Sequence, residues 1–128
     1  MAIRVVRLGT ERLKGEGLRI GTVRRPPRGV PKSEFATRNY YDVWLPQLAP
    51  SAEQVKIALA AKSEREWKAF VKAYRREMSE PDAARLLDLL AALAKDSAFS
   101  VGCYCEDEAR CHRSVLRELL QERGAVVR

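Results

Sequence analysis

The sequence predicts a single α/β domain, residues 1–128, with a small, mostly parallel sheet in a three-layer, Rossmann-like arrangement. Three observations support this fold class. Short β-branched segments cluster in the first third of the chain, helical segments fill the middle, and a strand followed directly by a helix closes the sequence. Strands that alternate with helices are typical of parallel sheets. The length suits one ordinary domain, and we find no repeat or long linker that would divide it.

Four segments have the apolar and β-branched composition of strands. They span residues 3–8, 18–24, 40–45 and 99–105. We expect the third, YYDVWL, to be short and buried, with Trp44 filling space in the core. Residues 25–33, RPPRGVPKS, follow the second strand, and their three prolines and one glycine exclude regular structure there.

Four further segments predict helices. Ser51 and Ser63 each begin a capping-box pattern, the first helix running to about residue 61. The second carries an apolar stripe at helical spacing, which indicates a packing face: Trp67, Phe70, Val71, Tyr74 and Met78. A third helix is expected from residues 79–82 to about 95, and a fourth from 114 to 122, where Gly124 stops it.

Composition narrows the classes of function. Lys and Arg number 24 against 17 Asp and Glu, and a net charge of +7 favours acidic partners such as nucleic acid or phosphorylated small molecules. Much of this charge alternates with Glu on predicted helices, as on solvated helix faces. No apolar run approaches the roughly 20 residues of a membrane span, and the N-terminus lacks a secretory pattern. We therefore expect a cytoplasmic protein without a membrane partner; the sequence does not indicate its oligomeric state.

All three cysteines and the only histidine lie within ten consecutive residues: Cys103, Cys105, Cys111 and His112. They fall between the last predicted strand and the last predicted helix. Ligands of open α/β sheets bind at this edge, where strands end. Clustered thiols in a reducing compartment are free, metal-binding or redox-active more often than disulfide-bonded. The sequence therefore predicts a thiol-centred site at this junction.

Several chemistries stay open for that site. In a cysteine-dependent enzyme, Cys111 or Cys105 would be the nucleophile and His112 a base or orienting group. Adjacent helical residues project about 100° apart, so Cys111 and His112 are not expected to form a dyad within the helix. In a redox protein, Cys105 and Cys111 would supply a nucleophilic and a resolving thiol. In the remaining alternative the cysteines take part in no reaction and serve only as small buried apolar side chains.

A metal site is a further alternative. Cys103, Cys105, Cys111 and His112 together form a Cys₃His set that suits zinc or another thiophilic ion. The Cys-x-Cys and Cys-His spacings are tighter than those of a standard structural zinc site, whereas three ligands with an open position would fit the pattern.

Four arginines are candidate substrate-binding residues: Arg24, Arg25, Arg28 and Arg113. The first three belong, with Lys32, to the most concentrated positive segment of the chain. This segment is either a loop that binds a small anionic ligand or a surface connector with solvated charges. A basic nucleic-acid-binding module is the remaining alternative, although no helix-turn-helix, zinc-finger or RNA-binding signature is present.

Five segments, in order along the chain, resemble the bacterial and archaeal family catalogued as domain of unknown function 488. They are IRVVRL (3–8), LRIGTVRRPPRG (18–29), DVWLPQLAPS (42–51), REWKAFVKAYRREM (65–78) and VGCYCEDEARCHRSVLRELL (101–120). The triplet Cys111-His112-Arg113, which opens a Leu-rich helix, is the most recognisable mark. The resemblance implies a Rossmann-like α/β fold and no established activity. Members commonly carry an Asp near the end of the second strand, where this chain has Thr22.

Overall fold

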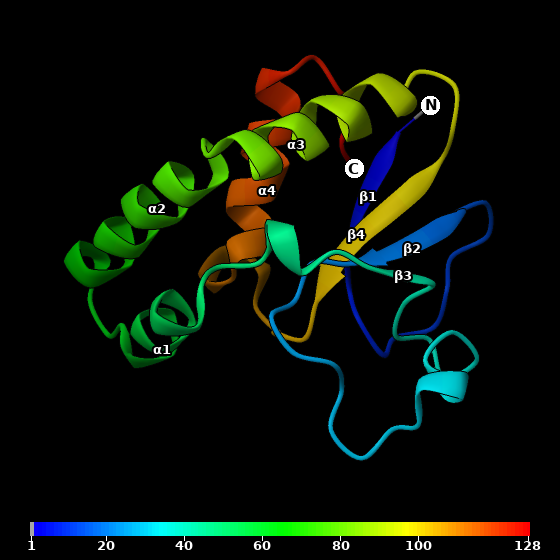
Figure 1. Cartoon of the computed structure of the whole chain (residues 1–128), viewed down its shortest axis with the longest axis horizontal. Coiled ribbons are helices and arrows are strands. Elements are labelled where there is room, and N and C mark those ends of the chain that lie inside the picture. Colours follow the sequence, from blue (N-terminus) through cyan, green and yellow to red (C-terminus); the bar gives the residue numbers. More distant parts are fainter. Residues whose placement is uncertain (1) are drawn as a thin grey trace.

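A computed structural model describes residues 2–128 as a four-stranded sheet with helices packed against it (Figure 1). The strands are β1 (Ile3–Arg7), β2 (Leu18–Gly21), β3 (Val43–Trp44) and β4 (Phe99–Cys103). Their order in the sheet is β1-β4-β2-β3, and all three pairings are parallel. The chain is a small α/β domain, as the sequence predicts. β4 lies inside the sheet and all five of its residues are buried.

The helices are α1 (Ala52–Ala60), α2 (Glu64–Met78), α3 (Pro81–Leu93) and α4 (His112–Glu122). The first three connect β3 to β4, and α4 follows β4 (Figure 1). The predicted caps are confirmed, because the Ser51 and Ser63 side chains each accept a hydrogen bond from the backbone N–H of the third residue of their helix. The apolar stripe of α2 packs with α3, α4 and the sheet residues Ile20 and Val101 in one core.

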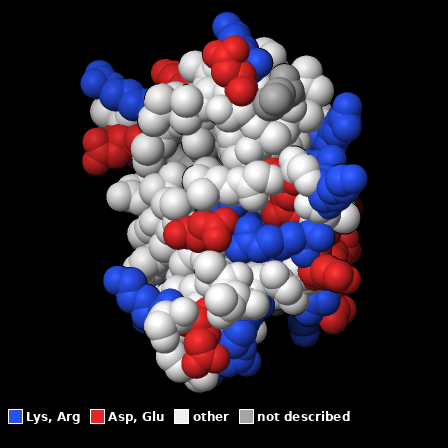
Figure 2. Space-filling view, turned by 90° about the vertical axis from the view of Figure 1, so that its right-hand side faces the viewer, with Lys and Arg blue, Asp and Glu red and all other residues white. Residues whose placement is uncertain are grey.

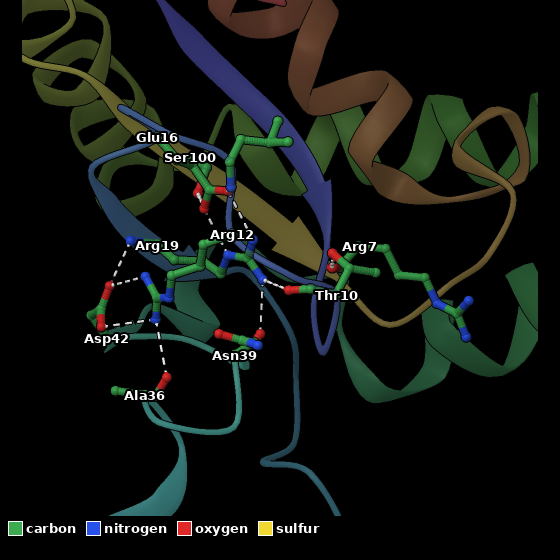
Figure 3. Close-up of polar contacts among 10 residues, drawn as sticks. Arg7, Thr10, Arg12, Glu16, Arg19, Ala36, Asn39, Asp42 and Ser100 are labelled. Atoms are coloured by element: carbon green, nitrogen blue, oxygen red, sulfur yellow. Dashed lines mark hydrogen bonds and ion pairs between the residues drawn. The ribbon is translucent and has the colours of Figure 1, made fainter.

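Loops cover the other side of the sheet, and a buried ion pair between Arg19 and Glu16 holds them there (Figure 3). Arg19 neighbours the core residue Ile20 on β2 and is fully buried on the opposite face. Its guanidinium donates to both carboxylate oxygens of Glu16, at 2.7 and 2.8 Å. It also donates to the carbonyl oxygens of Thr10 and Asn39, each at 2.8 Å. One side chain therefore ties together the loop of Thr10 and Glu16 and the loop of Asn39.

Two further side chains, Ser100 and Asp42, complete this network. The hydroxyl of Ser100, on β4, donates to Glu16 at 2.7 Å. Asp42 accepts hydrogen bonds from the Arg12 guanidinium at 2.8 and 3.1 Å, and from the Arg19 backbone N–H at 2.8 Å (Figure 3). Burial alone would raise the pKa of Glu16, but hydrogen bonds from Arg19, Ser100 and a backbone N–H outweigh it and lower that pKa to about 2.

This shift predicts how stability depends on pH. The carboxyl of Glu16 has an ordinary pKa of 4.5 and a folded-state pKa of about 2. Its contribution of about 2–3 kcal/mol is therefore fully present above about pH 4.5 and is lost as the pH falls toward 2. Urea unfolding between pH 2 and 6 measures this loss. The Glu16→Gln variant should show a shallower decline over the same range, and an unchanged slope would contradict the assignment.

The third strand differs from its prediction. Only Val43 and Trp44 pair with β2, and both are about 40% exposed because β3 is the edge of the sheet. Trp44 therefore does not fill the core; its indole N–H donates to the Val23 carbonyl oxygen at 2.7 Å. Tyr41 is the buried aromatic residue, and it precedes the strand. Its ring packs directly on Gly21, where there is no room for a Cβ atom.

Two surface properties bear on function. Among the residues that the structure describes, no helix is both long and apolar enough to cross a membrane. On the face drawn in Figure 2, Lys and Arg side chains alternate with Asp and Glu and do not form one continuous basic area. This view agrees with the interleaved charge in the sequence.

Candidate functional site

The candidate site lies where β4 and β2 end and α4 begins. β4 ends at Cys103, two residues earlier than predicted, and α4 begins at His112, two residues earlier than predicted. Cys111 is the N-cap of α4 and has an extended backbone conformation. The carboxyl edge of the parallel sheet and a helix N-terminus therefore meet at one place, which the sequence predicts for ligand binding.

Cys103 and Cys111 face each other in a small apolar cluster. Both are 2% exposed, and they pack with Leu8, Val23 and Tyr41. Their sulfur atoms lie within bonding distance, as a disulfide. Their Cα atoms are 7.8 Å apart, a wider separation than the roughly 4.4–6.8 Å that disulfides usually span. The backbones of these two bonded cysteines thus stand further apart than those of most disulfides.

His112 is the third member of this group. Its Nε2 atom lies 2.6 Å from the Thr22 carbonyl oxygen, and because a carbonyl only accepts, Nε2 carries the proton. The unprotonated Nδ1 atom lies 3.7 Å from the Cys111 sulfur. Tyr74 packs edge-to-face on the ring, with centroids 5.5 Å apart. Burial lowers the pKa of His112 to about 4, so the imidazole is neutral at pH 7.

Cys111 and His112 approach each other without forming a dyad inside the helix. Two residues inside a helix would diverge by about 100°. Cys111 instead precedes the first helical turn, and its extended backbone directs the sulfur toward Nδ1 of His112. The potential ligand atoms of Cys103, Cys111 and His112 all lie within 4.8 Å of one another. Cys105, the fourth residue proposed from the sequence, is not part of this group.

The acidic residues between the strand and the helix each have a local partner. Glu106 pairs with Arg7 at 3.6 Å, and the Asp107 side chain accepts a hydrogen bond from the backbone N–H of Ala109. Glu108 accepts two hydrogen bonds from Arg117, at 2.7 and 3.0 Å. These carboxylates are therefore engaged within the loop or by nearby arginines. The Cys/His group contains only sulfur and nitrogen atoms as potential ligands.

Cys105 and Arg113 lie beside the group. Cys105 is a free, half-buried cysteine. Arg113 is 3% exposed, and it donates to the Cys105 carbonyl oxygen at 2.5 Å. Its Nε atom is buried without a partner among the described residues, and burial lowers the pKa of Arg113. Arg113 therefore holds the loop that carries Cys111 in place and retains one unused donor.

The other candidate arginines divide into two sets. Arg24 donates to the carbonyl oxygens of Pro50 and Ala49, at 3.0 and 3.1 Å, so its guanidinium fixes the chain before α1. Arg25 and Arg28 are exposed and line a hollow with the side chains of Tyr40 and Tyr104. The structure thus leaves two of the three loop arginines free to meet a ligand.

Sequence reasoning missed the groups that orient His112. His112 donates a hydrogen bond to the backbone carbonyl oxygen of Thr22, so no side-chain type could signal this partner. Tyr74 belongs to the stripe that the sequence assigns to core packing, and it does pack there, with its hydroxyl donating to the Leu48 carbonyl oxygen at 2.6 Å. The same residue also supports the His112 ring.

The fold and site define a small parallel α/β protein with a Cys/His group at the carboxyl edge of its sheet. The chain belongs to the family of domain of unknown function 488: the family model described as "Active DUF488-N3 subclade" matches residues 3–124. No curated protein and no solved structure matches the chain. Membership therefore supports the fold, and the chemistry has to be argued from the site.

Proposed function

We propose that this chain binds a thiophilic divalent metal, zinc above all, through Cys103, Cys111 and His112. The observation that carries the proposal is the hydrogen bond from Nε2 of His112 to the Thr22 carbonyl oxygen. It fixes the tautomer that leaves the Nδ1 lone pair free, on the atom that lies 3.7 Å from the Cys111 sulfur. Histidines that bind metals almost always donate their other ring N–H to a carbonyl or carboxylate in this way.

The separation of the two cysteine backbones suits a bridging ion once the sulfur–sulfur bond of the structure is reduced. Two thiolates on a tetrahedral zinc, each with a bond of about 2.3 Å, would then stand about 3.8 Å apart. A metal would therefore suit the 7.8 Å between the Cα atoms of Cys103 and Cys111 better than a direct sulfur–sulfur bond. Two thiolates and one imidazole also form a soft donor set, which selects zinc over magnesium or calcium.

Three protein ligands leave one position of a tetrahedral ion open. Structural zinc sites use four protein ligands, whereas catalytic sites keep the fourth position for water or substrate. A bound ion there would polarise a substrate oxygen or activate a water molecule. The protein would supply the ligands, the Thr22 carbonyl oxygen that orients His112 and a mostly apolar surround. The proposal is therefore a three-ligand metal centre with one open position.

A cysteine-dependent enzyme is the second candidate, because the Cys111 sulfur lies 3.7 Å from a nitrogen that can accept its proton. The same geometry would serve a nucleophile acting on a small anionic substrate. Burial argues against it: both sulfurs are 2% exposed, so an electrophile could not reach them without local opening. The half-buried Cys105 is more open to solution but is not part of the group around His112.

Elemental analysis of protein purified without chelators and kept reduced with a phosphine, which cleaves the Cys103–Cys111 bond to two thiols, tests the two candidates. The metal proposal predicts about one zinc per chain, with His112→Phe losing it and Cys105→Ser retaining it. Protein without metal that zinc also fails to stabilise would overturn this proposal. If that protein instead shows a single thiol that an alkylating reagent modifies rapidly, and Cys111→Ser removes the reaction, the cysteine-dependent enzyme would be supported.

A further inference from the structure

A hollow of about 650 Å³ lies against the end of β4, between Tyr104 and the arginine-rich loop. Its lining residues are Arg25, Pro26, Pro27, Arg28, Tyr40 and Tyr104. The volume falls within the range of roughly 300–1,000 Å³ that is usual for small-molecule sites. The lining combines cationic and aromatic side chains and contains no acidic residue. A ligand for this hollow should therefore carry a negative charge and a flat surface.

The hollow is held in shape by contacts on both sides. The hydroxyl of Tyr104 donates to the Arg25 carbonyl oxygen at 2.8 Å, which ties the arginine-rich loop to the end of β4. Arg7 in turn donates to the Tyr104 carbonyl oxygen at 3.2 Å. The Pro26 and Pro27 rings restrict the loop backbone, so less conformational entropy is lost when a ligand binds. These contacts make a largely preformed site.

The two arginines of the hollow lack ionic partners. Within residues 2–128, Arg25 and Arg28 form no ion pair, whereas other arginines such as Arg12, Arg75 and Arg117 bind carboxylates. Guanidinium groups match phosphate and carboxylate geometry in a bidentate manner. The pair is therefore available to an anion from outside the chain.

Tyr40 and Tyr104 form the aromatic wall of the hollow. The Tyr40 and Tyr104 rings meet edge to face, with centroids 6.3 Å apart, and both are half-buried. They pack on the same cluster as Cys103 and Cys111, so the hollow borders the candidate metal centre. Nearby in this cluster, the buried hydroxyl of Tyr41 has no hydrogen-bond partner among the described residues. Aromatic rings beside arginines stack well with planar bases.

We infer that this hollow binds one nucleotide unit, with its base against Tyr40 and Tyr104 and its phosphate at Arg25 and Arg28. The inference goes beyond the proposed metal centre and does not depend on it, since none of the four residues is a proposed ligand. A free mononucleotide and the terminal nucleotide of a single strand share this chemistry.

Calorimetric titration with adenosine 5′-monophosphate tests the inference on the full chain, both zinc-loaded and treated with chelator. We expect saturable 1:1 binding in both forms. Arg28→Ala should weaken it about tenfold, and Tyr40→Ala should weaken it by a similar factor through lost stacking. Arg85→Ala is the matched control: it removes the same charge from α3, beside another surface hollow, and should leave the affinity within twofold.

Three comparison ligands complete the test. Adenosine and inorganic phosphate should each bind at least tenfold more weakly than the nucleotide. If a 5′-phosphorylated tetra-adenylate binds more than tenfold more tightly than adenosine 5′-monophosphate, the inference is supported and the ligand is the end of a strand. If the two bind equally, the inference is supported and the ligand is the free nucleotide. Nucleotide binding no tighter than that of phosphate, or weakened equally by Arg28→Ala and Arg85→Ala, would overturn it. Because the chelated protein is included, failure here is distinguishable from failure of the metal proposal.

Discussion

Replacing Arg19 with methionine is expected to destabilise the protein by about 3–5 kcal/mol. The substitution keeps an unbranched apolar stem but removes every side-chain donor to Glu16, Thr10 and Asn39. It leaves the Glu16 carboxylate 2% exposed, with only Ser100 and a backbone N–H as donors. An unpaired buried charge is far more costly than the loss of a surface contact. Urea unfolding at pH 7 measures the change.

Arg12→Met is the matched control for this prediction. Arg12 also binds a carboxylate through two nitrogens, but its pair with Asp42 is 28% exposed on both sides. Solvent screening limits such a pair to about 1 kcal/mol or less. Equal losses in Arg12→Met and Arg19→Met would contradict the view that burial sets the value of the Glu16–Arg19 pair.

Replacing Cys111 with serine is expected to lower the affinity for zinc by at least 100-fold. Serine is close in size to cysteine, so the buried site should still fold, but its hydroxyl is a poor ligand for a soft ion. At zinc concentrations 100-fold above the dissociation constant, the parent protein should gain about 2.7 kcal/mol, or about 10 °C in melting temperature. Cys111→Ser should show almost none of this gain in thermal unfolding.

Cys105→Ser separates the metal ligands from the other thiol. Cys105 lies six residues before Cys111 but outside the group formed by Cys103, Cys111 and His112. This variant should therefore keep the full zinc-dependent stabilisation. If Cys105→Ser loses it and Cys103→Ser keeps it, the ligand set would be wrong, even though the chain would still bind metal.

The helices were largely predictable because their signals are local. The serines at positions 51 and 63 cap their helices, and the stripe from Trp67 to Met78 lies in the core. The start of α4 was missed because no side chain caps it: Cys111 takes the N-cap position without a side-chain hydrogen bond. That error of two residues also hid the approach of the cysteine to His112.

The hydrogen-bond network around Arg19 and Glu16 could not be predicted from local sequence patterns. Arg19 was placed correctly on a strand, yet its partners come from residues 10, 16 and 39, and Glu16 also binds Ser100, 84 residues away. The aromatic run 40–45 was overpredicted as a strand because Tyr41 is buried by packing on Gly21 and not by strand pairing. Such tertiary contacts have no signature in a short window of sequence.

For the candidate site, the sequence predicted the position in the fold better than it predicted which residues come together there. It identified the junction after β4, and the structure brings Cys103, Cys111 and His112 together there. It could not separate Cys105 from this set, because the choice depends on where β4 ends and how the loop turns. It also could not predict that Arg24 would turn toward Pro50 while Arg25 and Arg28 line a hollow.

X-ray absorption spectroscopy at the zinc edge of the zinc-loaded chain tests the central claim most directly. The proposal predicts two sulfur ligands at about 2.3 Å and one or two nitrogen or oxygen ligands at about 2.0–2.1 Å, one of them with the outer-shell scattering of an imidazole. His112→Phe should remove the imidazole signal. A shell of oxygen and nitrogen alone, or one with three or four sulfurs, would contradict a centre formed by Cys103, Cys111 and His112.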